Sequence, residues 1–218
     1  MRLALCLGAM GAIGVALIGL DRNPVSAAEF YRITSPIAYD SPSGVSADGT
    51  VVLTSQHIWT PAGGLSQFAG RTDFYTRDIS NNGVVVGLID GSYIAFRTTL
   101  AGPLEELGAF SGGSSGDYSD AYGITPDGNV IVGYASSADG HEAFRWTAAT
   151  GLVGLGHMAP GDHFYDTAYG VSADGAVVVG LAESAAGPQA FRWTEATGMV
   201  GLGDLPGGDF NSSAQAIS

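Results

Sequence analysis

The pentapeptide Gly112-Gly113-Ser114-Ser115-Gly116 is the first candidate for chemistry, because it fits the Gly-x-Ser-x-Gly pattern in which a serine acts as a nucleophile. Such a serine needs a buried strand before it and a helix after it. Here the pentapeptide lies in a run of Gly and Ser that continues into Asp117-Tyr118-Ser119. We therefore interpret residues 112–116 as a flexible loop.

Metal binding by histidine is conceivable in one segment. His157 and His163 lie six residues apart with Asp162 and Asp166 beside them, and such a set could hold a transition metal. A solvated loop between two repeats is the simpler interpretation, because no histidine pair has the His-x3-His spacing of a metal site. The remaining histidines are His57 and His141.

Calcium is the one cofactor that the sequence leaves open. Several aspartates fall in the crossings between repeats, and carboxylates gathered there on one rim could hold Ca²⁺ together with loop carbonyls. No crossing has the Asp-x-Asp-x-Asp-Gly density of a calcium loop, and Asx-turns explain single aspartates equally well. The candidates are Asp117, Asp120, Asp162, Asp166, Asp204 and Asp209.

An internal repeat determines the architecture. Residues 168–205 align with residues 121–158 without a gap and are identical at 24 of 38 positions. The repeat units lie near 44–68, 78–110, 121–158 and 168–205, and 214–218 matches only the start of a fifth. A period of this length is typical of propellers, solenoids and arrays.

Each full unit predicts four short strands. In the fourth unit they are 169–172, 177–181, 190–194 and 199–203, with an Asp-Gly turn after the first. Four antiparallel strands in about 46 residues fit one blade of a propeller. We therefore expect an all-β, β-propeller-like array; a parallel β-solenoid is the alternative.

The third strand of each unit carries a recurring arginine between apolar residues. Arg97, Arg145 and Arg192 occupy the same position, and strand alternation places the neighbouring aromatic rings on the opposite face. We expect a structural role, with each guanidinium paired to an acid or to carbonyls of the adjacent blade. A ring of arginines facing a ligand is the alternative. The expected inter-blade core rings are Phe96, Phe144, Trp146, Phe191 and Trp193.

The N-terminal 28 residues have the organisation of a signal peptide. Arg2 precedes an apolar run from Leu3 to Leu20, and Val25-Ser26-Ala27 offers a cleavage site. We expect domain one to be residues 1–28 and domain two residues 29–218, with an uncleaved membrane anchor as the alternative. Cys6 lies in the removed segment, so we expect the mature chain to contain no disulfide.

Charge excludes two classes of partner. The chain has no Lys, 8 Arg against 21 acidic residues and a net charge of −13. Nucleic-acid binding requires cationic side chains that neutralise phosphates, and docking on an anionic membrane requires a basic surface. We therefore expect no nucleic-acid partner and no membrane span in the mature chain.

The repeat resembles a bacterial family of extracellular repeats, the HAF family. The resemblance spans residues 44–218 and rests on Gly-[Ile/Val]-[Ser/Thr]-x-Asp-Gly, Val-Val-Gly, Ala-Phe-Arg-Trp-Thr and Gly-Leu-Gly-Asp-Leu-Pro-Gly-Gly. It departs at the histidine that gives the family its name, where this chain has Ile94, Glu142 and Gln189. The resemblance implies secretion or surface display and brings no catalytic residue.

Two functions follow from the sequence. Repetition, loops that differ between units and no recurring catalytic group favour a non-enzymatic scaffold or binding module, secreted or on the cell surface, for a glycan or protein ligand. The alternative is a propeller-type glycoside hydrolase or lyase, which needs two carboxylates around a funnel. Its candidate acids, which look like surface residues, are Glu142, Glu183 and Glu195.

The partial fifth unit predicts that the chain continues. Residues 214–218 match the first strand of a unit, but no Asp-Gly turn or second strand follows. An unpaired strand would leave an open sheet edge. The alternative is closure by exchange, in which Phe30-Tyr31-Arg32-Ile33-Thr34 pairs as the outer strand of a shared blade.

Overall fold

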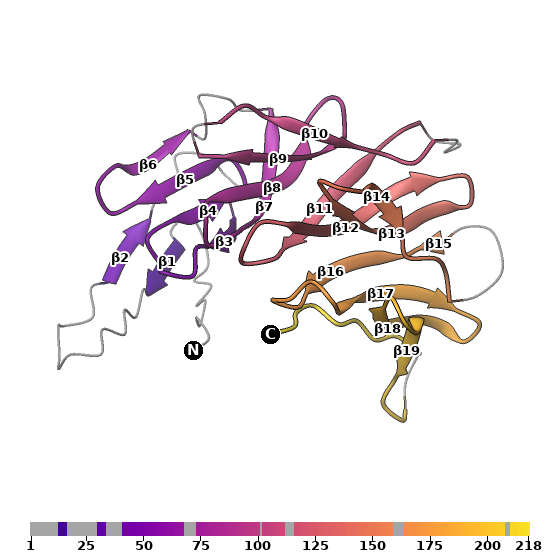
Figure 1. The fold of residues 1–218 in the computed structure, drawn as a ribbon. Helices are drawn as coiled ribbons and strands as arrows, with labels where there is room; N and C mark the ends of the chain where they lie inside the picture. The colour runs from indigo at the N-terminus through magenta and orange to yellow at the C-terminus, as the bar shows by residue number, and fades with distance from the viewer. Residues whose placement is uncertain are drawn as a thin grey trace.

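The computed structural model describes residues 13–16, 30–33, 41–67, 73–100, 102–111, 116–158, 164–207 and 210–218. Every regular element among them is a β-strand (Figure 1). Four antiparallel four-stranded sheets follow in chain order, and each corresponds to one predicted repeat. We call these sheets blades 1 to 4.

The strands of each blade pair in sequence order. Blade 1 comprises β3 (Pro42–Val45), β4 (Val52–Thr54), β5 (His57–Thr60) and β6 (Gly64–Gln67). Blade 2 comprises β7 (Phe74–Ile79), β8 (Val84–Ile89), β9 (Ala95–Thr99) and β10 (Glu105–Gly108). Blade 3 comprises β11 (Ser119–Ile124), β12 (Val130–Ser137), β13 (Gly140–Thr147) and β14 (Gly151–Gly154). Blade 4 comprises β16 (Thr167–Val171), β17 (Val178–Ser184), β18 (Gly187–Thr194) and β19 (Gly198–Gly203).

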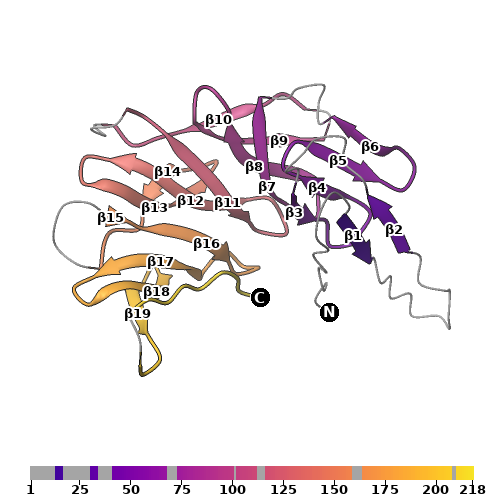
Figure 2. The ribbon, with the colours of Figure 1, turned by 180° about the vertical axis from the view of Figure 1, so that it is seen from behind.

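The blades follow one another around an arc, as seen from both sides in Figures 1 and 2. The first strands of consecutive blades contact one another, β3 with β7, β7 with β11 and β11 with β16. The first strand of each blade is therefore the innermost. Between blades 3 and 4, the short strand β15 (Phe164–Tyr165) pairs in parallel with the start of β13. This arrangement confirms the predicted propeller-like array.

Each part of the core joins two blades. One cluster combines Val86 of blade 2 with Phe144 and Trp146 of blade 3. A second combines blade 3 residues with Phe191 of blade 4, and a third joins Leu53 of blade 1 to the Phe74 and Phe96 rings of blade 2. The Phe–Arg–Trp strand therefore forms the inter-blade core as predicted, because its alternate residues face the preceding sheet.

A hydrogen-bonded turn explains the repeated Ser/Thr-x-Asp-Gly motif. In blade 3, Thr125 Oγ1 donates to Asp127 (2.6 Å) and accepts from Val130 N (3.0 Å), while Asp127 also accepts from Asn129 N (3.0 Å). The hydrogen bond from Thr125 is the main reason that the pKa of Asp127 lies below its ordinary value. Equivalent bonds form at Ser46–Asp48, Ser80–Asn82 and Ser172–Asp174.

A close approach of two strands explains the glycine of the Val-Val-Gly motif. At Gly87, Gly133 and Gly180 the second strand passes a β-bulge in the first. A Cβ at Gly133 would lie well under 3.0 Å from the carbonyl oxygen of Asp120, and Gly87 and Gly180 have the same relationship to their own blades. Only glycine fits where backbones approach this closely.

The C-terminal segment, 210–218, lies against blade 4 as a first strand lies against the preceding blade. Ser212 N donates to the carbonyl of Pro188 (3.2 Å), and Ser212 Oγ accepts from Ala190 N (3.0 Å). Ser119 makes the same two contacts with blade 2. The start of the predicted fifth unit therefore takes the position that the repeat assigns to it.

Near the N-terminus, β1 (Ile13–Ala16) pairs antiparallel with β2 (Phe30–Ile33). Segment 30–34 was the candidate for the outer strand of a shared blade, and in the structure its described residues pair with β1 instead. The predicted leader, 1–28, contains β1 and otherwise lies outside the described residues. None of the described residues forms a helix with the length and apolarity that crossing a bilayer requires.

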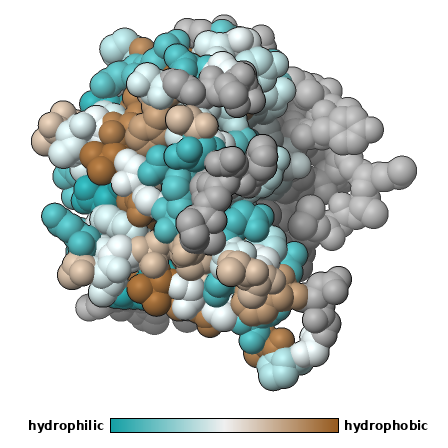
Figure 3. Space-filling view, turned by 90° about the vertical axis from the view of Figure 1, so that its right-hand side faces the viewer, coloured by the Kyte–Doolittle hydropathy of each residue, from teal (hydrophilic) through white to brown (hydrophobic). Residues whose placement is uncertain are grey.

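The outermost strands of blades 3 and 4 expose apolar side chains. Val153 of β14 and Val200 and Leu202 of β19 are solvent-exposed. Viewed from this side, brown apolar atoms are interspersed with teal polar atoms (Figure 3). Scattered apolar residues of this kind are ordinary on a protein surface.

Candidate functional site

Equivalent positions on the innermost strands line one cavity, which we call the central cavity. Its volume is about 390 Å³, within the range of about 300–1,000 Å³ that is usual for small-molecule sites. The repeat brings one residue from each unit to its wall. In the four blades it lies two positions before the apolar residue that ends the first strand, and in the C-terminal segment, which forms no strand, it lies two positions before Ile217. These residues are Ser43, Arg77, Tyr122, Tyr169 and Gln215.

An ion pair between blades 2 and 3 fixes the charge at the cavity. Arg77 Nη2 lies 2.7 Å from Asp120 Oδ2, and Arg77 Nε also donates to this carboxylate. Burial raises the pKa of Asp120 above its ordinary value, although the hydrogen bond and charge of Arg77 act against that shift. Burial by itself lowers the pKa of Arg77, but the hydrogen bond and charge of Asp120 outweigh it, so the pKa is raised. The guanidinium also lies over the Tyr122 ring, 5.0 Å from its centroid.

A second carboxylate borders the same cavity. Asp78 accepts hydrogen bonds from Ile79 N (2.8 Å) and, across the blade boundary, from Ile124 N (3.2 Å). Burial raises its pKa to about 6, and the two backbone hydrogen bonds oppose that shift. Asp78 therefore connects blade 2 to blade 3 and titrates near neutrality.

Six rings, which we call the aromatic lane, continue from the cavity wall. Tyr134 stacks on Tyr122 (5.9 Å between centroids) and on His141 (5.0 Å, 2° between planes). Tyr169 lies edge-on to Tyr122 at one end, and Tyr165 contacts His141 at the other. Tyr118 packs edge-on against both Tyr134 and His141. The lane joins the central cavity to the exposed Tyr165 on β15.

Burial favours the uncharged forms of three rings in the lane. It raises the pKa of Tyr122 and Tyr134 and lowers the pKa of His141. The neutral imidazole and the protonated phenols are therefore the stable forms at neutral pH. The lane combines flat apolar rings with polar edges, an arrangement suited to ligands that have both apolar and hydroxyl-bearing surfaces.

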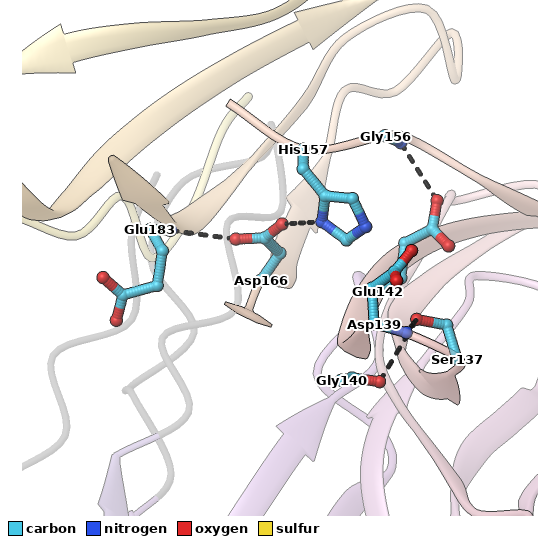
Figure 4. Close-up of polar contacts among 8 residues, drawn as sticks. All are labelled: Ser137, Asp139, Gly140, Glu142, Gly156, His157, Asp166 and Glu183. Atoms are coloured by element: carbon cyan, nitrogen blue, oxygen red, sulfur yellow. Dashed lines mark hydrogen bonds and ion pairs between the residues drawn. The ribbon is translucent and has the colours of Figure 1, made fainter. Parts of the chain in front are cut away.

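A second polar group lies between blades 3 and 4 (Figure 4). Asp166 Oδ2 lies 2.6 Å from His157 Nδ1, and Asp166 Oδ1 accepts from Glu183 N (2.9 Å). Burial raises the pKa of Asp166, while the hydrogen bond of His157 opposes the shift. These contacts hold the loop after β14 against β17, so we assign the pair a structural role.

Glu142 and Gln189 occupy the same position in successive units, and both have a structural role. Glu142 Oε1 accepts from Gly156 N, and Gln189 Oε1 accepts from Gly203 N, both at 3.1 Å. Each side chain therefore holds the segment that ends the fourth strand of its blade against the start of the third.

The structure disperses the calcium candidates. Asp120 lies on β11 and not in a crossing loop, and its carboxylate binds Arg77. Asp166 is buried against His157, Asp117 is exposed, and Asp204 accepts from the backbone of Leu205 and Asn211. Within the described residues, no group of three or more His, Cys, Asp or Glu is arranged to hold a metal. Asp162, Asp209, His163 and the Gly112–Ser115 loop lie outside those residues.

Of the recurring arginines, Arg145 makes the predicted pairing with a carbonyl of the adjacent blade, whereas Arg97 contacts the adjacent blade through an aromatic ring. The Arg97 guanidinium lies 4.5 Å from the centroid of Trp146 in the next blade, and Arg145 Nε donates to the carbonyl of Gly175. Arg192 is exposed in blade 4. With Arg145 and Trp193, it lines a cavity of about 650 Å³ between blades 3 and 4.

Sequence reasoning did not single out the residues of the central cavity. Arg77, Tyr122 and Tyr169 occupy the same position in consecutive units, and this position varies in residue type, so it did not stand out as a motif. The usable signal was the alignment itself, because varied residues at one inward-facing position of a repeat indicate a binding surface.

Comparisons with known proteins identify the fold. No family model matches the chain, and no curated protein matches it. Among solved structures, a putative TolB from Agrobacterium tumefaciens is similar with a TM-score of 0.60 and 12% identity, over 81% of this chain and 66% of that one. TolB from Acinetobacter baumannii is similar with a TM-score of 0.58 and 13% identity, over 94% of this chain and 52% of that one.

The fold is therefore a β-propeller. The chain spans about two thirds of the first of these proteins and about half of the second. At such low identity the likeness concerns the fold, and function has to be argued from the cavity and its residues.

Proposed function

We propose that this chain is a non-enzymatic binding propeller that holds its ligand at the central cavity. One observation carries the proposal: the first strands of the four blades and the C-terminal segment together bring five residues to one cavity wall, namely Ser43, Arg77, Tyr122, Tyr169 and Gln215. Four residue types, Ser, Arg, Tyr and Gln, occur at this one repeat position. A scaffold that repeats while its cavity-facing residues vary is typical of recognition.

The bonding of the two acids supports binding over turnover. Asp120 is held by Arg77, and Asp78 accepts two backbone N–H groups. Such groups are fixed and internally satisfied, whereas a general acid must pass its proton to a substrate atom within hydrogen-bond reach. The carboxylates therefore suit orientation of the cavity wall better than proton transfer.

A carbohydrate-active enzyme is the second candidate, and Asp78 is the observation that favours it. A carboxyl with a pKa of about 6 beside a cavity matches the requirement for a general acid. A second carboxylate, Asp120, binds Arg77, the residue that precedes Asp78 in the sequence. The sequence candidates Glu142, Glu183 and Glu195 do not line this cavity among the described residues.

One assay separates the two candidates. The purified chain is incubated with polysaccharides of several classes, and binding and reducing-end release are measured together. We expect the wild-type chain to bind a polysaccharide without releasing reducing ends. The Asp78→Asn variant should likewise release none. Release that disappears in Asp78→Asn would identify the enzyme and overturn the binding proposal.

We also propose that the protein acts outside the cytoplasm, either secreted or displayed on the cell surface, as the leader-like segment 1–28 and the HAF-like repeats imply. Mass spectrometry of exported protein should find an N-terminus at Ala28 or Glu29. Retention of Met1 in the membrane fraction would instead favour an anchored protein.

A further inference from the structure

Resting on the proposed function, we propose a ligand class for the same site: the central cavity and the aromatic lane bind an uncharged polysaccharide chain. The site offers three properties that together match such a ligand. Its cavity wall carries groups that both donate and accept hydrogen bonds, its rings extend away from the cavity, and its arginine is neutralised by an aspartate.

The cavity wall is suited to hydroxyl groups. Ser43, Tyr122, Tyr169 and Ser218 contribute hydroxyls and Gln215 contributes an amide. Each of these groups can donate and accept. A sugar hydroxyl also donates and accepts, so each wall group can act as donor or as acceptor toward it. Arg77 is held in one orientation by Asp120, which reduces the entropy lost when it contacts a ligand.

The lane gives the site length. From Tyr169 the ring contacts pass through Tyr122, Tyr134 and His141 to Tyr165, with centroid separations between 5.0 and 5.9 Å. Tyr165 is 59% exposed at the far end. Apolar C–H faces of pyranose rings pack on aromatic side chains such as the exposed Tyr165 ring. A ligand of several sugar units therefore fits better than a single sugar.

Charge decides between neutral and acidic chains. Arg77 is the cation in the cavity lining, and Asp120 neutralises it. Asp78 adds a titrating carboxyl, His141 is held neutral, and the protein carries a net charge of −13. An acidic polysaccharide would meet repulsion, and the described residues of the cavity lining offer no cation besides Arg77 to offset it.

Calorimetry on the purified full chain tests the proposal. The probes are cellohexaose, maltohexaose and hexa-N-acetylchitohexaose as neutral chains, hexagalacturonate as an acidic chain, and a random-sequence peptide pool. We expect at least one neutral hexasaccharide to bind, its trisaccharide to bind more weakly, and hexagalacturonate not to bind.

Point variants locate the binding. Tyr165→Ala should weaken affinity for the neutral chain about tenfold, equivalent to about 1.4 kcal/mol, and Tyr165→Phe should retain most of it because the ring remains. Leu202→Ala is the matched control, because Leu202 is similarly exposed (57%) but lies on the outermost strand β19. Both side chains are at the surface, so the three variants should fold.

The outcomes separate this inference from the proposed function. The chain could bind only the peptide pool or only hexagalacturonate, with an affinity that Arg77→Gln weakens. That result would overturn the neutral-glycan inference but would still support the proposal of a binding propeller. Binding of a neutral chain that Tyr165→Ala does not weaken would overturn the role of the lane. Failure of every neutral chain to bind would also overturn the inference.

Discussion

Arg77 and Asp120 form an asymmetric ion pair across the boundary between blades 2 and 3. The nitrogen–oxygen distance is 2.7 Å, but the Asp120 side chain is 2% exposed while the Arg77 side chain is 35% exposed. Removing one partner therefore has a different effect from removing the other. Loss of the arginine leaves a charge in the interior, and loss of the carboxylate leaves a cation that can reach water.

The first prediction follows from this asymmetry. Arg77→Ala should lower the free energy of unfolding at pH 7 by about 2–4 kcal/mol, because the buried Asp120 carboxylate loses its cation. The loss should be smaller at pH 4, where Asp120 takes up a proton. Asp120→Asn should cost less than Arg77→Ala at pH 7. Urea unfolding at both pH values measures this, and an equal loss for Arg77→Ala at pH 4 and 7 would contradict the electrostatic explanation.

The second prediction concerns Asp78 and pH. Its folded pKa is raised from 3.8 to about 6, so the folded protein keeps a proton that the unfolded chain has already released. Stability from this group is present below about pH 4 and is lost as pH rises to about 6. We expect wild type to lose about 2–3 kcal/mol relative to Asp78→Asn across this range.

Urea unfolding at half-unit pH steps measures the Asp78 effect. Asp127→Asn is the control, because the pKa of Asp127 is lowered by the Thr125 hydrogen bond and its contribution has the opposite sign. That contribution is present above the unfolded pKa and is lost as pH falls. If wild type and Asp78→Asn keep a constant difference between pH 4 and 7, the carboxyl is not perturbed.

Local repetition made most of the fold predictable. The Ser/Thr-x-Asp-Gly motif predicted a tight turn, and the structure adds why the first residue is Ser or Thr: its hydroxyl binds both the Asp and the next strand. The Phe–Arg–Trp strand predicted an inter-blade core because strand alternation is a local rule. Both features recur along the chain, so the same turn and the same strand are predicted independently in several units.

The site was less predictable because it depends on contacts between units. Arg77 and Asp120 are 43 residues apart, and His141 lies against Tyr134 and Tyr165 only after three strands have paired. Asp120 was assigned to a crossing loop because polar residues mark loops. Its position on a strand is tolerated because the arginine of the preceding blade satisfies its charge.

The third prediction tests the strand crossing at Gly133. Gly133→Ala would force a Cβ against the carbonyl oxygen of Asp120, so we expect a loss of at least about 3 kcal/mol in the free energy of unfolding. Gly151→Ala is the control, because Gly151 has a φ of +66° but open space around it. It should lose about 1 kcal/mol from backbone strain alone. Thermal and urea unfolding compare them, and similar losses would show that the crossing tolerates a side chain.

The last prediction separates two arginines that share a repeat position. The Arg97 guanidinium lies 4.5 Å from the Trp146 ring centroid of the next blade and also binds Glu105 (2.7 Å), whereas Arg192 is exposed. Arg97→Ala should lower the free energy of unfolding by about 1–2 kcal/mol, because it removes a cation–π contact and uncovers a buried indole. Arg192→Ala should change it by less than about 0.5 kcal/mol.

Two further measurements assign the Arg97 effect to the ring and not to the ion pair. Glu105→Ala should cost less than about 0.5 kcal/mol, because its carboxylate is mostly in solvent. Tryptophan emission should shift to longer wavelength in Arg97→Ala, since solvent reaches Trp146, and should stay unchanged in Glu105→Ala. Of the two arginines, only Arg97 lies over a tryptophan of a following blade. Equal losses in the free energy of unfolding for Arg97→Ala and Arg192→Ala would therefore show that the contact with Trp146 does not contribute.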